Sequence, residues 1–180
     1  DHQILLLKQD GSVFTFPAYG FTPPNVTNIL AVAVTEEFCF ALRADGKVLN
    51  WRYANDTPDG PPAIEIQQLT NVVGLASGEN WVSVALRKDG TVVSLLQSAQ
   101  WTPVPGISNA IAVTGGRGFA ALLATGEVQT WGVDDVLVVP EGLRAQRIAG
   151  GLLHVTALTT APFFDAQPRY QTNYTGGSAS

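Results

Sequence analysis

The stretch Ala85-Leu-Arg-Lys-Asp-Gly-Thr-Val92 joins two apolar runs through an Asp-Gly pair, and it decides the fold because it recurs along the chain. Similar copies begin at Leu6, Ala41 and Ala121, and a fifth, incomplete copy begins at Ala157. The starts of successive copies lie 35, 44, 36 and 36 residues apart. Internal repeats of this period indicate an array of similar structural units.

Each copy predicts a β-hairpin. Asp and Gly between two apolar runs are a strong hairpin signal, because both residues tolerate the positive φ of a tight turn. A further apolar strand precedes each copy, for example at Ile29–Val34, and a large apolar residue follows the last Val by three positions. These large residues are Phe16, Trp51, Leu95 and Trp131. Three or four short strands in each repeat match one blade of a propeller.

We therefore predict an all-β fold of propeller blades, each with three or four antiparallel strands: about four full blades and a partial one. A helical solenoid would show an apolar period of 3.6 residues, which no stretch has. The propeller repeats are expected over residues 1–161, with units that start near Leu6, Ala41, Ala85, Ala121 and Ala157. Residues 162–180 are expected to be a linker or the start of an immunoglobulin-like module.

Composition limits the classes of partner. The chain has 180 residues, a formal net charge of −5 and no cluster of Lys and Arg, which argues against a nucleic-acid partner. The longest apolar runs, such as Ile29–Val34, are far shorter than the roughly 20 residues that span a membrane. One Cys and two His are too few for a zinc site of the usual ligands, so we expect no metal.

Two motifs resemble catalytic signatures, and we interpret both as parts of the repeat. Gly116-Arg-Gly-Phe-Ala-Ala121 matches a dinucleotide-binding pattern, with Asp134 and Asp135 further along, but it aligns with strands of the other repeats. Gly106-Ile-Ser-Asn-Ala110 half-matches a nucleophile elbow, yet its triad would need His154, which is a repeat-position residue. Cys39 lies in an apolar run, which favours a buried structural thiol. We therefore expect no enzyme activity and no cofactor.

The repeat also resembles a known family. Val73-Gly-Leu-Ala-Ser-Gly78 followed by Val84-Ala-Leu-Arg-Lys-Asp-Gly-Thr-Val92 is similar to the repeats of the regulator-of-chromosome-condensation family of β-propellers. The resemblance covers about residues 2–160, and the short period is more similar to secreted bacterial members, including a propeller-type β-lactamase inhibitor. The usual His of the family's central strand remains only at His154 and, less closely, His2, which implies packing rather than chemistry at the other positions.

The resemblance and the loops together predict a non-catalytic extracellular or cell-surface module that recognises protein or glycan. Aromatic residues and Arg on the loops of a rigid scaffold are typical binding anchors. The candidate residues are Arg52, Tyr53, Trp81 and Trp101. The alternative is a soluble protein inhibitor of an enzyme, similar to the β-lactamase inhibitor, and a nucleotide-exchange role like that of nuclear members is a more distant one.

We also expect this chain to be part of a larger ring. Four and a half blades leave strand edges unpaired, which proteins seldom tolerate. Further repeats of the same polypeptide or another subunit would complete the ring, and a closed ring of unusually few blades is the remaining alternative. The absence of Met favours further repeats of a longer polypeptide.

Overall fold

Among the residues described in the computed structural model, all the regular secondary structure is β-strand, as predicted. The structure describes residues 4–16, 26–35, 37–52, 62–78, 82–95, 100–132, 138–151 and 154–159. Within this part of the chain, no helix is long and apolar enough to cross a membrane.

Five antiparallel sheets follow one another along the chain. The first is β1 (Ile4–Leu7) with β2 (Val13–Phe16), and the last is β14 (Arg147–Gly150) with β15 (Val155–Leu158). The second sheet contains β3 (Ile29–Val34), β4 (Phe38–Arg43), β5 (Val48–Arg52) and β6 (Ile64–Glu65). The third contains β7 (Val72–Ser77), β8 (Ser83–Arg87), β9 (Val92–Leu95) and β10 (Trp101–Pro103). The fourth contains β11 (Ala110–Gly115), β12 (Gly118–Leu123) and β13 (Val128–Gly132).

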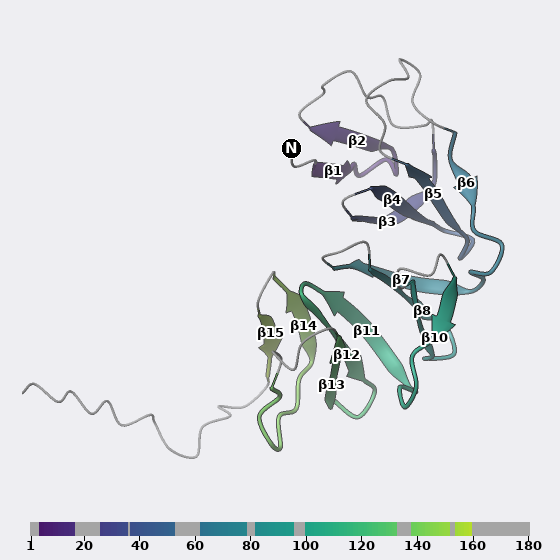
Figure 1. Ribbon diagram of the computed structural model, residues 1–180. Coiled ribbons are helices and arrows are strands. Elements are labelled where there is room, and N and C mark those ends of the chain that lie inside the picture. Colours follow the sequence, from purple (N-terminus) through teal and green to yellow (C-terminus); the bar gives the residue numbers. More distant parts are fainter. Residues whose placement is uncertain are drawn as a thin grey trace, which may run out of the picture.

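The sheets stack around an arc, as blades of a propeller do (Figure 1). The first strands of successive sheets, β3, β7, β11 and β14, contact one another along the inner side. The last strands, β6 and β10, lie on the convex side of the arc, and β1–β2 and β14–β15 form its two ends. Three sheets therefore have the predicted three or four strands, and the two terminal sheets have two among the described residues.

The sequence repeat and the sheet are out of phase by one strand. Ala41, Ala85 and Ala121, which begin the repeat units, lie in the second strand of their sheets rather than the first. The side chains of all three are fully buried, because a small residue is needed where the second strand of a sheet packs closely on the first strand of the next, β4 on β7, β8 on β11 and β12 on β14.

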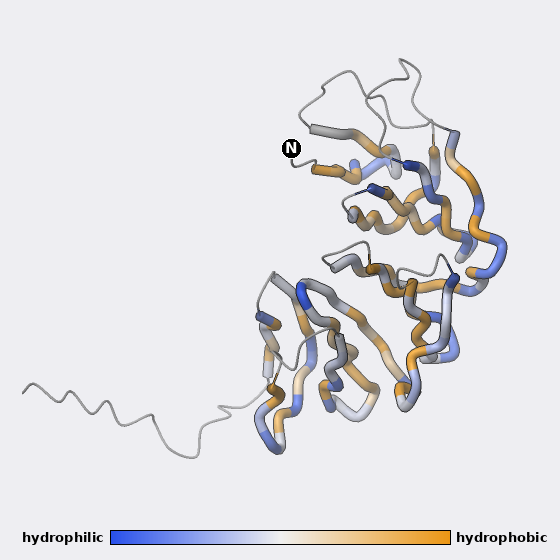
Figure 2. Tube along the Cα trace, viewed as in Figure 1, coloured by the Kyte–Doolittle hydropathy of each residue, from blue (hydrophilic) through white to orange (hydrophobic). Residues whose placement is uncertain are grey.

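The core lies between the sheets. Between the second and third sheets, Phe40, Leu42 and Val48 pack with Val72 and Val93. Each such side chain contributes about 1.5–3 kcal/mol when it is removed from water. Trp51, predicted to be a packing residue, is 2% exposed. In Figure 2 the hydrophobic colour follows the strands, whereas the connection from β6 to β7 is mostly hydrophilic.

The Asp-Gly turns differ from the expected type. Only the glycines have a positive φ, for example +79° at Gly46 and +81° at Gly90, and the aspartates before them do not. The two-residue turn that we expected needs positive φ at both positions. The chain instead makes a longer loop, in which Arg43 N–H donates to the Lys47 carbonyl at 2.9 Å and Gly46 N–H donates to the Arg43 carbonyl at 2.9 Å.

Among the described residues the fourth sheet has three strands, and a proline removes one of the bonds that a fourth strand would bring. In the two sheets before it, the chain just after β6 and β10 donates to the sheet: Ile66 N–H to Val48 and Val104 N–H to Val92, at 2.9 and 2.8 Å. The corresponding residue of the fourth sheet is Pro140, because Leu143 N–H donates to it just as Leu69 N–H donates to Ile66. Proline has no N–H, so this bond cannot form.

Candidate functional site

The blades present two different rims. The Asp-Gly rim is the edge that carries the turns with Gly11, Gly46, Gly90 and Gly126. At the opposite rim β5 ends at Arg52 and β10 begins at Trp101. Both rims are made of connections between strands, where binding residues concentrate on a rigid scaffold.

Two of the predicted binding residues are described at the opposite rim. The Arg52 side chain is 64% exposed and forms an ion pair of 3.1 Å with Glu37. Trp101 is half-buried and packs edge-on against Phe40 of the neighbouring sheet, with 6.0 Å between the ring centroids. Trp101 therefore joins two blades, and its role in binding stays a prediction. Tyr53 and Trp81 lie outside the described residues.

The motifs that resembled catalytic signatures are parts of the repeat. Gly116 and Arg117 form the turn between β11 and β12, and the residues from Gly118 to Ala121 lie in β12. The dinucleotide pattern requires a helix at this position, which the strand excludes. His154, at the start of β15, is exposed, and its ring lies beside Gly151. Asp134 and Asp135 lie outside the described residues.

Cys39 is the buried structural thiol that the sequence predicted. Its side chain is 1% exposed, and burial raises the pKa of the thiol to about 12. A thiol with such a pKa holds its proton at neutral pH and is a poor nucleophile or metal ligand. The described residues contain no group of three or more His, Cys, Asp or Glu side chains that could hold a metal ion.

Backbone hydrogen bonds join each turn of the Asp-Gly rim to the next blade. The glycine carbonyls of these turns accept from the N–H groups near the start of the following sheet. The bonds run from Ile29 to Gly11 (3.3 Å), Val72 to Gly46 (3.0 Å), Ala110 to Gly90 (3.0 Å) and Ala145 to Gly126 (2.8 Å). The rim is therefore a continuous hydrogen-bonded band across neighbouring blades.

Asparagine completes this band in three sheets. Asn28, Asn71 and Asn109 precede the first strand of their sheets and have φ between +56° and +59°. Asparagine tolerates the left-handed region better than most residues. Each asparagine carbonyl accepts from the Asp-Gly turn of its own sheet, as in the bond of 2.8 Å from Lys88 N–H to Asn71. The asparagine thus links two successive turns.

The aspartates hold the turns through their carboxylates. Asp89 accepts from the Thr91 hydroxyl at 2.6 Å and from the Thr91 N–H at 2.9 Å, and these bonds lower the pKa of Asp89. The Ser12 hydroxyl and N–H lower the pKa of Asp10 in the same way. Hydrogen bonding to the charged form favours ionisation, so these groups stay ionised at neutral pH.

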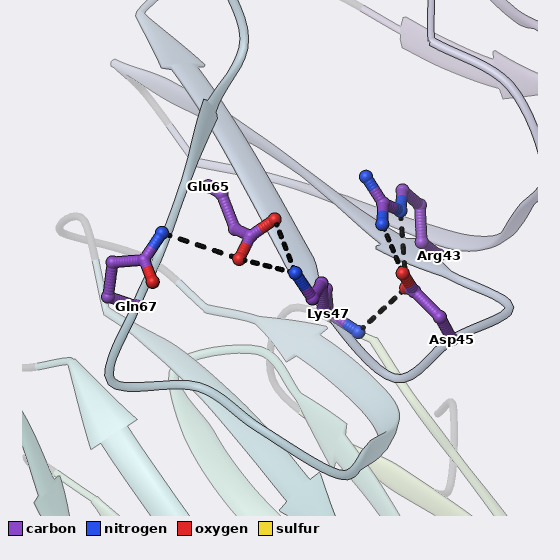
Figure 3. Close-up of polar contacts among 5 residues, drawn as sticks. All are labelled: Arg43, Asp45, Lys47, Glu65 and Gln67. Carbon is purple, nitrogen blue, oxygen red and sulfur yellow. Dashed lines mark hydrogen bonds and ion pairs between the residues drawn. The ribbon is translucent and has the colours of Figure 1, made fainter.

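Ion pairs occupy most of the other charges at this rim (Figure 3). The Arg43 guanidinium bonds to Asp45 and lowers the pKa of that carboxyl, while Lys47 Nζ lies 2.9 Å from Glu65 Oε1. A further pair joins Arg144 and Glu127 at 3.0 Å. Solvent screens exposed pairs of this kind, so they orient side chains more than they stabilise the fold.

Large aliphatic side chains are exposed to solvent at the same rim in several sheets. Leu30, Val73 and Ile111 are 63%, 54% and 59% exposed. Each is the second residue of its first strand, and each lies at a β-bulge where the register with the second strand shifts by one residue. A bulge adds a residue and re-aims its side chain. Three sheets therefore present an exposed aliphatic residue at an equivalent position.

The sequence interpretation missed this surface. Its signal is a hydroxyl residue, an asparagine and two apolar residues, at Thr27-Asn28-Ile-Leu30, Thr70-Asn71-Val-Val73 and Ser108-Asn109-Ala-Ile111. The pattern stands just before the strand that begins each blade, outside the Asp-Gly stretch from which the repeat was counted. The apolar pairs there have the pattern of ordinary strand residues, and the exposure that the bulge produces is visible only in the structure.

No family model and no curated protein matches the chain. Solved structures do match. The yeast protein Prp20p shares 18% identity, with a TM-score of 0.55 over 72% of this chain and 43% of Prp20p. Human WBSCR16 shares 22% identity, with a TM-score of 0.56 over 72% of this chain and 45% of that protein. BamB from Moraxella catarrhalis shares 15% identity, with a TM-score of 0.55 over 75% of this chain and 42% of BamB.

The chain therefore spans less than half the length of each of these proteins. Identities this low show the fold alone. The structural matches and the five radially stacked sheets show that this chain has a β-propeller fold like that of yeast RCC1, which is also called Prp20.

Proposed function

We propose that this chain is a non-catalytic protein-binding module of an extracellular or cell-surface protein. The observation that carries the proposal is the recurrence of Leu30, Val73 and Ile111, three large aliphatic side chains exposed at equivalent positions of one rim. Single exposed apolar residues are common on soluble proteins, whereas a set that repeats on a rigid scaffold is a feature of interaction surfaces.

The chemistry of the rim supports binding rather than catalysis. The carboxylates of Asp10, Asp45 and Asp89 hold turn hydrogen bonds, and Glu65 and Glu127 are in ion pairs. A general acid or base needs a pKa near the working pH, and the pKa values of these three aspartates are lowered instead. Similar propellers bind proteins: Prp20p binds Gsp1p and histones, and Kap60 binds yeast RCC1.

A photo-crosslinking experiment tests this proposal. A benzophenone amino acid is placed at Val73, and as a matched control at Val138, which is 86% exposed and lies in the connection between β13 and β14 rather than in a first strand. We expect a discrete protein adduct from position 73 in the source organism's surface fraction and none from position 138. Equal labelling from both positions, or no adduct from position 73, would contradict a binding role for this rim.

We further propose that other blades cover the outward faces of the terminal sheets. The β1–β2 sheet packs Leu5, Leu7 and Val13 against the second sheet, but its other face leaves Ile4, Leu6 and Phe14 about half exposed. At the far end of the arc Leu158 is 57% exposed. Apolar faces cover each other between the first and second, the second and third, and the third and fourth sheets, so further repeats of the same polypeptide or another subunit suit these two faces.

The mass of the native protein tests this second proposal. We expect the source organism to make either a polypeptide clearly larger than the 19.1 kDa of this chain or an assembly of several subunits. Denaturing mass spectrometry gives the first quantity and light scattering gives the second. A strictly monomeric native protein near 19.1 kDa would overturn it. Protease treatment of intact cells, which should remove the protein, tests the proposed location.

A further inference from the structure

We propose that the Asp-Gly rim binds an extended polypeptide segment that carries aliphatic side chains and a carboxylate. This inference rests on the proposed protein-binding function and specifies the form of the partner. The surface consists of Leu30, Val73 and Ile111, together with Asn71, Asn109 and Lys88. All six residues belong to the described part of the chain: five lie in or just before the first strands of the second, third and fourth sheets, and Lys88 lies in the turn between β8 and β9.

The first observation behind this inference is a groove between neighbouring blades. Ile111 of the fourth sheet lines it together with the turn residues Ala124 and Gly126, and Arg144 and Gln146 line it from the side of the last sheet. The groove is bridged beneath by the hydrogen bond from Ala145 N–H to the Gly126 carbonyl. It is thus a feature of the junction between one Asp-Gly turn and the next blade.

The same junction recurs one blade earlier. There Ala110 N–H donates to the Gly90 carbonyl, as Ala145 N–H donates to Gly126. The residues at the equivalent positions are Val73, Lys88, Asn109 and Ile111. An aliphatic residue of one blade, Val73, and an asparagine and an aliphatic residue of the next, Asn109 and Ile111, therefore belong to this junction. One blade earlier still, Leu30 precedes the junction with Asn71 and Val73.

The aliphatic side chains favour a polypeptide over a sugar. Leu, Val and Ile offer branched hydrocarbon surface that packs against other aliphatic side chains, whereas sugar rings stack on flat aromatic rings. More than half of each of the three side chains is exposed, so contact with a partner would remove apolar surface from water. Their repetition from blade to blade suits a segment that crosses several blades.

The asparagine amides supply the complement to a peptide backbone. The side chains of Asn71 and Asn109 are exposed, and neither forms a hydrogen bond with another described residue. A carboxamide offers two N–H donors and a carbonyl acceptor, which match the C=O and N–H of a peptide unit. The backbone of Asn109 is fixed by the bond of 2.9 Å that its carbonyl accepts from Ala124, so its side chain leaves from a rigid position. Such pre-organisation favours binding.

Charge sets the last requirement. Lys88 is exposed and forms no ion pair with any described residue, while its neighbour Asp89 is held by Thr91. The cations Arg43, Lys47 and Arg144 are already paired with carboxylates. Arg87 also helps to lower the pKa of Asp89, so Arg87, Lys88 and Asp89 together carry one excess positive charge, which a carboxylate of the partner segment would complement.

A random linear peptide library displayed on phage provides the probe for the full 180-residue chain. We expect enrichment of peptides with spaced aliphatic residues and an Asp or Glu. Val73→Thr and Ile111→Thr keep the side-chain size or branching, and we expect each to weaken binding at least tenfold. Val138→Thr, a matched exposed control, should leave binding unchanged. Asn109→Gly keeps a residue that tolerates positive φ and removes the amide, so it should also weaken binding tenfold.

Nuclear magnetic resonance separates direct contact from altered folding. The side-chain NH₂ signals of Asn71 and Asn109 in the ¹⁵N-labelled chain should shift when a selected peptide is added, and those of Asn50 should not. Enrichment of no peptide, or selected peptides that bind equally to all the variants, would overturn the inference. Crosslinking of a folded protein at position 73 with no peptide binding would overturn it while leaving the proposed function in place. Capture of a glycan in place of peptides would overturn both.

Discussion

At the residue scale, Gly90 and Gly106 separate two reasons for which a turn needs glycine. Both have a similar positive φ, +81° and +77°. A Cβ on Gly90 would lie 2.7 Å from Cα of Asn109, whereas no heavy atom lies within 4 Å of a Cβ on Gly106. We predict that Gly106→Ala lowers the free energy of unfolding by about 1–2 kcal/mol, the cost of the left-handed conformation. Gly90→Ala should lower it further, because the neighbouring backbone must move.

Urea unfolding of the two variants measures this difference. Gly106→Ala is the matched control, because it changes the same residue type in the same conformation without the close approach. Equal losses of stability in the two variants would show that Gly90 does not contact the next blade as closely as described.

Asp89 makes the stability of the chain depend on acid. Its pKa is lowered from the ordinary value of 3.8, first by the Thr91 hydroxyl and then by the Thr91 N–H. A group with a lowered folded pKa contributes stability that is present above its unfolded pKa and is lost as the pH falls through the folded pKa. Asp89→Asn keeps an acceptor for Thr91 but cannot titrate. As the pH is lowered below 3.8, we predict that the free energy of unfolding of the Asp89→Asn variant falls less steeply than that of the unmodified chain.

Denaturant unfolding at a series of pH values checks the prediction. Asp10 and Asp45 also have lowered pKa values and remain in the variant, so part of the acid dependence should persist. Identical pH profiles for Asp89→Asn and the unmodified chain would contradict a role for the Asp89 carboxylate in the turn.

The backbone conformation of a residue could be predicted from the sequence where a local rule determines it. It could not be predicted where tertiary contacts determine it. The glycine of each Asp-Gly turn in the repeat was expected to have positive φ, and Gly11, Gly46 and Gly90 do. The same rule was wrongly extended to the aspartate, whose carboxylate instead caps the N–H two residues ahead, as Asp45 does for Lys47. The left-handed Asn71 could not be foreseen from propensity alone, because its conformation is set by its links to two turns.

At the scale of elements, the contact between Trp101 of β10 and Phe40 of β4 joins two blades. The rings meet edge to face, with an angle of 86° between their planes. Aromatic pairs in this geometry contribute about 0.5–1.5 kcal/mol beyond the area that they bury. We predict a coupling free energy of this size in a double-mutant cycle with Trp101→Leu and Phe40→Leu.

Urea unfolding of the two single variants and the double variant gives the coupling. The effect of each substitution on contacts with all other residues cancels in the cycle, so the remaining free energy is the interaction between Trp101 and Phe40. Additive losses, with no coupling between the two substitutions, would mean that Trp101 does not pack on Phe40 and is free to serve as a binding anchor.

Strands were predictable because alternation, turns and period agreed, and the second to fourth sheets have the expected three or four strands. Candidate binding residues were not, because exposure depends on the neighbouring blade. Trp101 follows a connection and resembles a loop anchor, yet the adjacent sheet half-buries it. Leu30 lies in an apolar strand and resembles a core residue, yet a bulge exposes it.

At the scale of the whole molecule, the outward face of β1–β2 can be changed without disturbing the arc. Leu6 is 46% exposed on that face, and most substitutions at exposed positions alter stability by less than about 0.5 kcal/mol. We predict that Leu6→Lys folds normally in the native protein but loses its association with the blade that covers this face. Light scattering of the native assembly, or limited proteolysis of a longer native polypeptide, detects the loss.

Leu5→Lys is the contrasting variant, because Leu5 packs against the core of the second sheet and its substitution should impair folding. Retention of the native mass and of protease resistance by Leu6→Lys would contradict the proposal that another blade covers Leu6.

The claim that the Asp-Gly rim is the binding face has one most direct measurement. Hydrogen–deuterium exchange of the chain, alone and with the partner recovered by crosslinking, reports which backbone amides a partner covers. Slower exchange is predicted in the complex around residues 28–31, 71–74 and 109–112, which carry the exposed aliphatic and asparagine side chains, and around residues 88–91, which carry Lys88. Protection confined to the opposite rim, around Arg52 and Trp101, would contradict it.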